Sequence, residues 1–268
     1  MRINSLSDIK KSLKKLKIKK GSSCLLHSSI IGLGLIENLP INRIPEKIFN
    51  LIFHEIGKNG TISALTPYYD YGLKLKKFDL AKSESAKDLG SLSEFINKKK
   101  KSTRSLNPLF NISSFGKKAK FITNQKTVMA FGADSAWDQL FKLNSDIIFL
   151  GCDLSVCTFI RYIEFRFGVP YLYNKHFNRN VCVNKKVLSK YSSSTLRYLN
   201  LDIQYDTSKF QKTLLKKKVL RISRHKNINF MAVDMQSCFK IGIEELKKDL
   251  FFFLKRAPKY KNKLLPLI

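Results

Sequence analysis

The sequence has few acidic residues, histidines and cysteines, and each shortage narrows the classes of protein to which it can belong. Its 268 residues include 20 Asp and Glu against 50 Lys and Arg, which gives a formal net charge of +30. A site for a polycationic ligand should be lined with carboxylates, and this chain has few to offer. The charge favours partners that carry phosphate, although a compositional drift toward lysine would explain much of the same excess.

The five cysteines show no paired CxxC spacing, and the four histidines are scattered along the chain. Neither a zinc site nor a disulfide framework is therefore predicted, and reduced thiols indicate a cytoplasmic protein. The longest apolar runs, such as Ile147–Gly151 and Leu250–Leu254, are far too short to cross a bilayer. The N-terminus has no apolar signal core. We expect no metal, no membrane span and no export.

Apolar periodicity predicts that helices and strands alternate over the first 65 residues. The expected elements are a helix over Ser7–Lys20 with Ser7 as its N-cap, a strand over Ser23–His27, a helix from Asn42 or Pro45 to Gly57, and a strand over Thr61–Leu65. A strand, a helix and a second strand in this order indicate an α/β domain.

A second strand–turn–helix unit is the clearest local pattern of the chain. Asp146–Leu150 has the composition of a buried strand, and Asp153 or Ser155 in the following turn can cap a helix that runs to about Phe167. Gly168 fits the position directly after the last helical residue.

The remaining segments are less regular. Residues 68–88 have no apolar period and are expected to form a loop, whereas residues beyond 178 contain short, strongly basic, strand-like segments and a final helix over Ile241–Lys255. We predict an α/β fold, a mixed β-sheet with helices on both faces. Residues 1–177 should form its core, and residues 178–268 a basic region and C-terminal helix that complete the same domain.

Five short segments occur in the order and spacing of a known family. They are His27-Ser28-Ser29 with Gly32 and Gly34; Gly60-Thr61-Ile62 with Pro67; Arg104-Ser105-Leu106-Asn107-Pro108 with Phe115-Gly116; Phe131-Gly132 with Ser135-Ala136-Trp137; and Phe149-Leu150-Gly151 with Thr158, Glu164 and Val169-Pro170-Tyr171. Together they cover most of residues 5–255, and the chain resembles the aminoglycoside 3-N-acetyltransferase family. Each segment alone is a weak signal, and five in order are more specific.

The resemblance implies transfer of an acyl group from acetyl-CoA or another acyl-CoA to an amine. In the family pattern T-x-x-H-x-x-E, the glutamate orients a histidine that takes the proton of the attacking nitrogen. This chain has Thr158, Arg161 and Glu164 at the three positions. Arginine cannot act as a base near neutral pH, because its pKa lies above about 12. Arg161 and Glu164 should therefore form an ion pair.

Three explanations for the missing histidine stay open. The first is another base, for which His176 is the best candidate. The second is water and positioning alone, with Arg161 polarising the thioester oxygen or binding a phosphate. The third is an inactive relative that still binds CoA or another anionic ligand. Glu164, Arg161 and His176 are thus the candidate catalytic residues. The resemblance further implies that an acyl-CoA-binding core, residues 1–177, holds the donor through His27, Ser28, Ser29, Arg104, Ser105 and Thr158.

The amine acceptor can be argued from charge. Aminoglycosides are polycations, so the basic chain favours an anionic, nucleotide-linked amino sugar of surface-polysaccharide synthesis, with antibiotic modification second. A deep acidic pocket beside Glu164 would reverse this order. The rival class is a binding protein for anionic ligands, but the lysines are spread along the chain without an RNA-binding motif, so nucleic acid is not expected. The oligomeric state is not predicted.

Overall fold

The computed structural model describes residues 3–124, 127–198, 200–226 and 228–260. Within these residues the largest sheet has seven strands in the order β13-β14-β8-β2-β4-β7-β6. Their bounds are β13 Arg221–His225, β14 Ile228–Asp234, β8 Asp146–Leu150, β2 Ser23–Ser28, β4 Thr61–Leu65, β7 Ile112–Gly116 and β6 Thr103–Arg104. β2 runs parallel to both β4 and β8, and the other neighbouring pairs are antiparallel, so the sheet is mixed.

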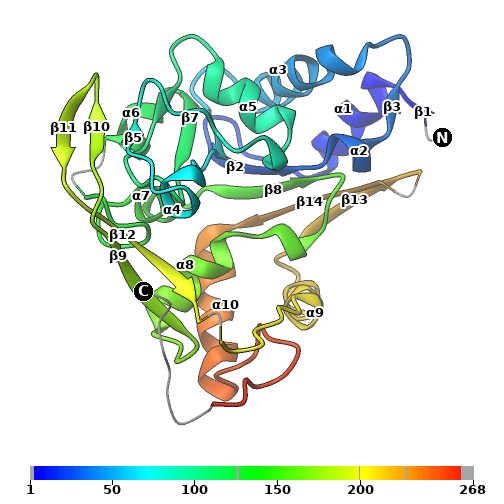
Figure 1. The fold of residues 1–268 in the computed structure, drawn as a ribbon. Helices are drawn as coiled ribbons and strands as arrows, with labels where there is room; N and C mark the ends of the chain where they lie inside the picture. The colour runs from blue at the N-terminus through cyan, green and yellow to red at the C-terminus, as the bar shows by residue number, and fades with distance from the viewer. Residues whose placement is uncertain (1–2, 125–126, 199, 227, 261–268) are drawn as a thin grey trace.

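Helices cover both faces of this sheet (Figure 1), as predicted. Side chains alternate along the central strands: Cys24, Leu26 and Ile148 point into one core, whereas Leu25 and Ile147 point into the other. The first core is closed by α1 Leu6–Lys15, α3 Ile44–Ile56 and α5 Ser91–Lys98. The second is closed by α6 Ala119–Thr123, α7 Ala136–Lys142, α8 Phe159–Phe167, α9 Ser208–Lys216 and α10 Met235–Lys248.

Shorter elements complete the structure. They are the helices α2 Ile30–Leu33 and α4 Asp70–Leu73, the pair β1 Ile3–Asn4 and β3 Leu35–Ile36, the three-stranded sheet of β11 Lys186–Ser189, β10 Val181–Val183 and β5 Phe78–Asp79, and the ribbon of β9 Leu172–Phe177 with β12 Ser192–Arg197. The turns η1 Ile41–Arg43, η2 Lys87–Leu89 and η3 Leu154–Val156 are 3₁₀ helices.

The two predicted units have the expected form. α3 ends at Gly57, whose φ of 73° lies in the left-handed region, and α8 ends at Gly168 with a φ of 83°. The predicted cap of α8 is different. Asp153 accepts a hydrogen bond from the Ser155 N–H and caps η3, whereas α8 itself begins after Thr158.

Three other predictions are corrected. The N-terminal helix is capped by Ser5, not Ser7, because Ser5 and Asp8 exchange the two bonds of a capping box. The last helix starts earlier, after its cap Asp234, and stops at Lys248, since Asp249 adopts an extended backbone. The loop over residues 68–88 contains α4, β5 and part of η2.

Candidate active site

A pocket of about 800 Å³ lies at the edge of the sheet where the parallel strands β2, β4 and β8 end. Leu65, the last residue of β4, lines it together with residues 155–158, 160 and 161 of the turn after β8 and the start of α8. This is the edge at which open α/β sheets usually bind ligands. We call it the Arg161 pocket.

Apolar side chains dominate the wall of the Arg161 pocket. Those that line it include Tyr69, Leu73, Leu89, Leu109, Phe110, Val156, Ile160, Phe177 and Leu196. Arg161 and Lys175 are the charged residues in its described lining, which contains no Asp or Glu. The pocket beside Glu164 is therefore basic, and the acidic pocket that would favour a polycation is not found among these residues.

Behind this wall, Glu164 is fully buried and accepts hydrogen bonds from three side chains. The Tyr171 hydroxyl donates to Oε1 at 2.7 Å, the Tyr205 hydroxyl lies 2.9 Å from both carboxylate oxygens, and Nη1 of Arg161 lies 3.4 Å from Oε2. Arg161 also donates to the Tyr205 oxygen, and its guanidinium lies 4.2 Å from the centre of the Tyr205 ring. The predicted ion pair of Arg161 and Glu164 is thus present.

Burial sets the protonation behaviour of this cluster. It raises the pKa of Glu164, although Arg161 and the two tyrosine hydroxyls act in the opposite direction. Burial and the nearby Glu164 carboxylate also raise the pKa of Tyr205 well above its ordinary value. A tyrosine in this state cannot accept a proton near neutral pH. The cluster therefore offers a fixed cation and hydrogen-bond donors to the pocket, but no histidine-like base.

His176 does not lie in the Arg161 pocket. It is an exposed residue of β9, and its neighbours Lys175 and Phe177 both line the pocket. Because successive side chains of a strand point to opposite faces, His176 points away from the pocket. The structure thus separates the three candidate catalytic residues into the adjacent pair of Arg161 and Glu164 and a distant His176.

His27 is the second-to-last residue of β2 and lies in the protein interior. Its imidazole stacks on Phe149 with ring centres 5.3 Å apart, and Nε2 is buried without a hydrogen-bond partner among the described residues. Burial lowers the pKa of His27 to about 4. Ser28 and Ser29 follow at the strand end, and Ser29 caps α2 by accepting a bond from the Gly32 N–H at 2.9 Å. None of these three residues lines the Arg161 pocket.

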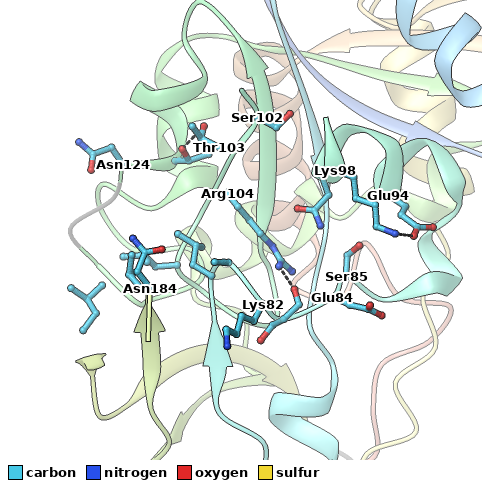
Figure 2. A pocket seen from close by; sticks show the side chains of 18 of the residues that line it. Lys82, Glu84, Ser85, Glu94, Lys98, Ser102, Thr103, Arg104, Asn124 and Asn184 are labelled. Atoms are coloured by element: carbon cyan, nitrogen blue, oxygen red, sulfur yellow. Dashed lines mark hydrogen bonds and ion pairs between the residues drawn. The ribbon is translucent and has the colours of Figure 1, made fainter. Parts of the chain in front are cut away.

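The other three predicted donor-site residues lie in three different places. Thr158 lines the Arg161 pocket. Arg104 lines a second pocket of about 980 Å³, shown in Figure 2 and called the Arg104 pocket below. Ser105 is buried, and its hydroxyl accepts a bond from the Ile112 N–H at 2.8 Å, which joins two backbone segments.

Thiol catalysis has no support in this site. Burial raises the pKa of Cys152 to about 11 and that of Cys157 to about 12, so neither forms a thiolate readily at neutral pH. In the part of the chain that the structure covers, no group of three or more His, Cys, Asp or Glu is placed to hold a metal ion. No helix of the same part is long and apolar enough to span a membrane.

Sequence reasoning missed Tyr205 as a site residue. It is 41 positions from Glu164 in the chain, and no motif or periodic pattern links the two. Tyr171 stood in a segment quoted for the family resemblance, but without a role. The Tyr171 hydroxyl reaches Glu164 Oε1 at 2.7 Å because the chain turns back directly after α8 at Gly168.

Comparison with known proteins gives a consistent result. Residues 25–247 match the sequence profile of a family described as aminoglycoside 3-N-acetyltransferase. Similar solved structures include AAC-IIIb in a binary complex with CoASH, with a TM-score of 0.76, 18% identity, and coverage of 96% of this chain and 100% of that one. A mutant of aminoglycoside acetyltransferase AAC(3)-IVa in complex with a gentamicin has a TM-score of 0.75, 18% identity, and coverage of 96% and 93%.

A third solved structure, aminoglycoside acetyltransferase AAC(3)-Xa, has a TM-score of 0.77 at 15% identity, with coverage of 92% of this chain and 94% of that one. No curated protein sequence matches the chain. At these identities the solved structures establish the fold, and the sequence profile, which spans most of the chain, establishes the family.

Proposed function

The chain belongs to the aminoglycoside 3-N-acetyltransferase family, and from that premise we propose that it moves an acyl group from acyl-CoA to the amine of an anionic amino sugar, in the Arg161 pocket. The observation that carries the proposal is a guanidinium at the pocket wall, held by a buried carboxylate, in a lining without acidic residues. We further propose that the transfer proceeds without the family histidine.

Acyl transfer to an amine places negative charge on the thioester oxygen, and that charge needs hydrogen-bond donors. Arg161 has five N–H groups, and its contacts with Glu164 and Tyr205 use Nη1. The rest of the guanidinium can face the pocket, which Arg161 lines beside the Thr158 side chain. Glu164 and Tyr205 then act as positioning residues, because they hold the cation in place without touching the reacting atoms.

The proton balance follows from the lack of a base. The acceptor must arrive as a free amine, and its nitrogen forms the bond to the acyl carbon as the thioester C–S bond breaks. The amine proton passes to water, and CoA leaves as a thiolate that takes up a proton from solvent. General acid–base help is worth about 10² to 10⁴ in rate, so transfer without it is slower but not abolished. The log of kcat/KM should rise with a slope near one as pH increases toward the pKa of the acceptor amine.

Charge selects the acceptor class. The Arg161 pocket contains Arg161 and Lys175 and no described carboxylate, so it repels a polycationic aminoglycoside and attracts an anionic sugar. Modification of an aminoglycoside is the second candidate, favoured by the family and by the gentamicin complex of the AAC(3)-IVa mutant.

The test is a titration of the purified protein with acetyl-CoA by calorimetry, together with a thiol-release assay on amino-sugar phosphates and aminoglycosides. Donor binding with turnover on the anionic acceptor supports the proposal. Turnover on aminoglycosides alone would overturn the acceptor class. Binding without any turnover would identify a relative that has lost the reaction, and lack of binding would contradict the donor itself.

Arg161→His is the informative variant, because it restores the family histidine three residues before Glu164. We expect its pH profile to gain a plateau set by the new imidazole, whereas the native profile keeps rising. Arg166→His is a matched control: Arg166 lies on the same helix, but its guanidinium contacts Asp138 and Tyr162 and does not line the pocket. An unchanged profile in both variants would contradict the role given to position 161.

A further inference from the structure

The Arg104 pocket is a second large cavity, and basic side chains dominate its charge. The residues that line it include five basic ones, Lys82, Lys87, Lys98, Lys120 and Arg104, against the two acidic ones Glu84 and Glu94. Lys98 and Glu94 neutralise each other through an ion pair of 2.6 Å. Figure 2 shows Arg104 and Lys82 among the side chains that line this cavity, together with the ion pair of Lys98 and Glu94.

Arg104 is a half-buried cation whose hydrogen-bond partners are all neutral. Its guanidinium donates to the Asn111 Oδ1 at 2.6 Å, to the Thr66 carbonyl at 2.7 Å and to the Ser83 carbonyl. It also lies 5.1 Å from the centre of the Phe78 ring. Among the described residues no carboxylate lies within 4 Å of it, and burial lowers its pKa to about 10. A partly desolvated cation without a counter-ion is unfavourable, and a bound anion would relieve that cost.

The exposed lysines of the pocket add to this charge. Lys82, Lys87 and Lys120 are exposed, and within the described chain none of them forms an ion pair. A cavity that combines a half-buried guanidinium with exposed lysines resembles in its chemistry the sites that hold phosphate, where arginine gives fixed geometry and lysine a point charge.

The Arg104 pocket and the Arg161 pocket adjoin at one edge of the sheet. β6 runs parallel to β4, since each is antiparallel to β7, and Ser113 of β7 pairs with both Ala64 and Arg104. Two strand spacings of about 4.8 Å place the Cα atoms of Ala64 and Arg104 roughly 10 Å apart. The next residue, Leu65, lines the Arg161 pocket, and Arg104 bonds the carbonyl of Thr66 directly after it. The linings of the two cavities therefore lie close together at this edge of the sheet.

We infer that the Arg104 pocket binds the phosphate esters of a nucleotide-type ligand, and that these are the phosphates of the acceptor, whose sugar amine lies in the Arg161 pocket. This assignment rests on the proposed acyl transfer for the identity of the amine, but the phosphate site stands on its own geometry. The phosphates of CoA are the other source of the same chemistry, and the test distinguishes the two.

The experiment measures the affinity of the full chain for uridine diphosphate and for CoA by calorimetry. The test variant is Lys82→Ala with Lys120→Ala, since both side chains are exposed and their loss should not disturb folding. The matched control is Lys58→Ala with Lys212→Ala, which removes the same charge at exposed positions outside both pockets. A hydrogen bond to a charged group is typically worth about a tenfold change in affinity for each lysine that reaches phosphate.

We expect the test variant to bind uridine diphosphate at least tenfold more weakly than the control, with the affinity for CoA unchanged. If only the affinity for CoA fell, the phosphate site would be supported, but its assignment to the acceptor would be overturned. Equal affinities in test and control variants, for both ligands, would overturn the site. Arg104→Gln serves as a second variant, with its fold checked by circular dichroism, because Arg104 also joins three backbone segments.

The outcome is separable from that of the proposed function. If the binding of uridine diphosphate depends on Lys82 and Lys120 but no thiol is released, the phosphate site is supported and the proposed acyl transfer is contradicted. If both double variants release thiol at the same rate when the acceptor is limiting, the acyl transfer is supported and the role of the Arg104 pocket in binding the acceptor is contradicted.

Discussion

The buried imidazole of His27 makes the stability of the protein depend on pH in a way that can be calculated. Its folded-state pKa is about 4, against 6.5 for an exposed histidine, because burial disfavours the charged ring. Between these two values the unfolded chain binds a proton that the folded chain does not. The free energy of unfolding therefore falls as pH decreases through this window, and the full stability is present above pH 6.5.

The magnitude follows from the same two values. At pH 5 the unfolded state is almost fully protonated at His27 and the folded state almost fully neutral, which lowers the free energy of unfolding by about 2 kcal/mol relative to pH 8. Other groups also titrate in this range, so the contribution of His27 is obtained as a difference between two proteins. His27→Phe keeps an aromatic ring beside Phe149 and removes the titration.

The assay is urea unfolding of both proteins at pH 8 and pH 5, followed by circular dichroism. We expect the wild type to lose about 2 kcal/mol more than His27→Phe between the two pH values. His54→Phe, on the exposed side of α3, should keep the wild-type loss. An identical pH dependence in wild type and His27→Phe would refute the reasoning. It would show that His27 keeps an ordinary pKa in the folded state and could serve as a base.

Three further outcomes are expected. Tyr205→Phe removes the hydroxyl that satisfies Glu164 but keeps the ring beside Arg161, and should cost about 1 to 3 kcal/mol in urea unfolding. Combined with Arg161→His it should raise the rate of thiol release above that of Arg161→His alone, because the imidazole then no longer competes with the Tyr205 hydroxyl for Glu164. Gly32→Ala should destabilise the fold by about 3 kcal/mol or more, measured by thermal unfolding, since its Cβ would lie 1.8 Å from the Gly151 oxygen.

The strand–helix–strand units were predictable because local signals and tertiary packing agree there. α3 carries its apolar residues at helical spacing and ends at a glycine, and the buried strand β8 is followed by a turn, a helix and Gly168. Two glycines quoted for the family, Gly32 of the first segment and Gly151 of the last, also have a physical reason. Gly32 and Gly151 lie so close that neither position has room for a side chain without a shift.

β14 and the tyrosines around Glu164 were not predictable by the same means. The apolar run within Ile228–Asp234 is only Phe230–Val233, which can belong to a strand or to a helix. The place of β14 between β13 and β8 depends on pairing with residues about 80 positions away. Tyr205 lies in a segment without regular structure apart from a single bridge to Leu254. Its contact with Glu164 arises only when distant parts of the chain pack together.

The retained Glu164 is the clearest case in which a matching residue does not carry its function with it. In the family pattern the glutamate orients a histidine, and its charge favours the protonated ring. Here the same carboxylate is fully buried, and Arg161, Tyr171 and Tyr205 satisfy it. A buried carboxylate left without the histidine would be strongly unfavourable, so a cation and two hydroxyls in its place stabilise the fold. Glu164 is therefore needed for the position of Arg161 even if no proton ever passes through the pair.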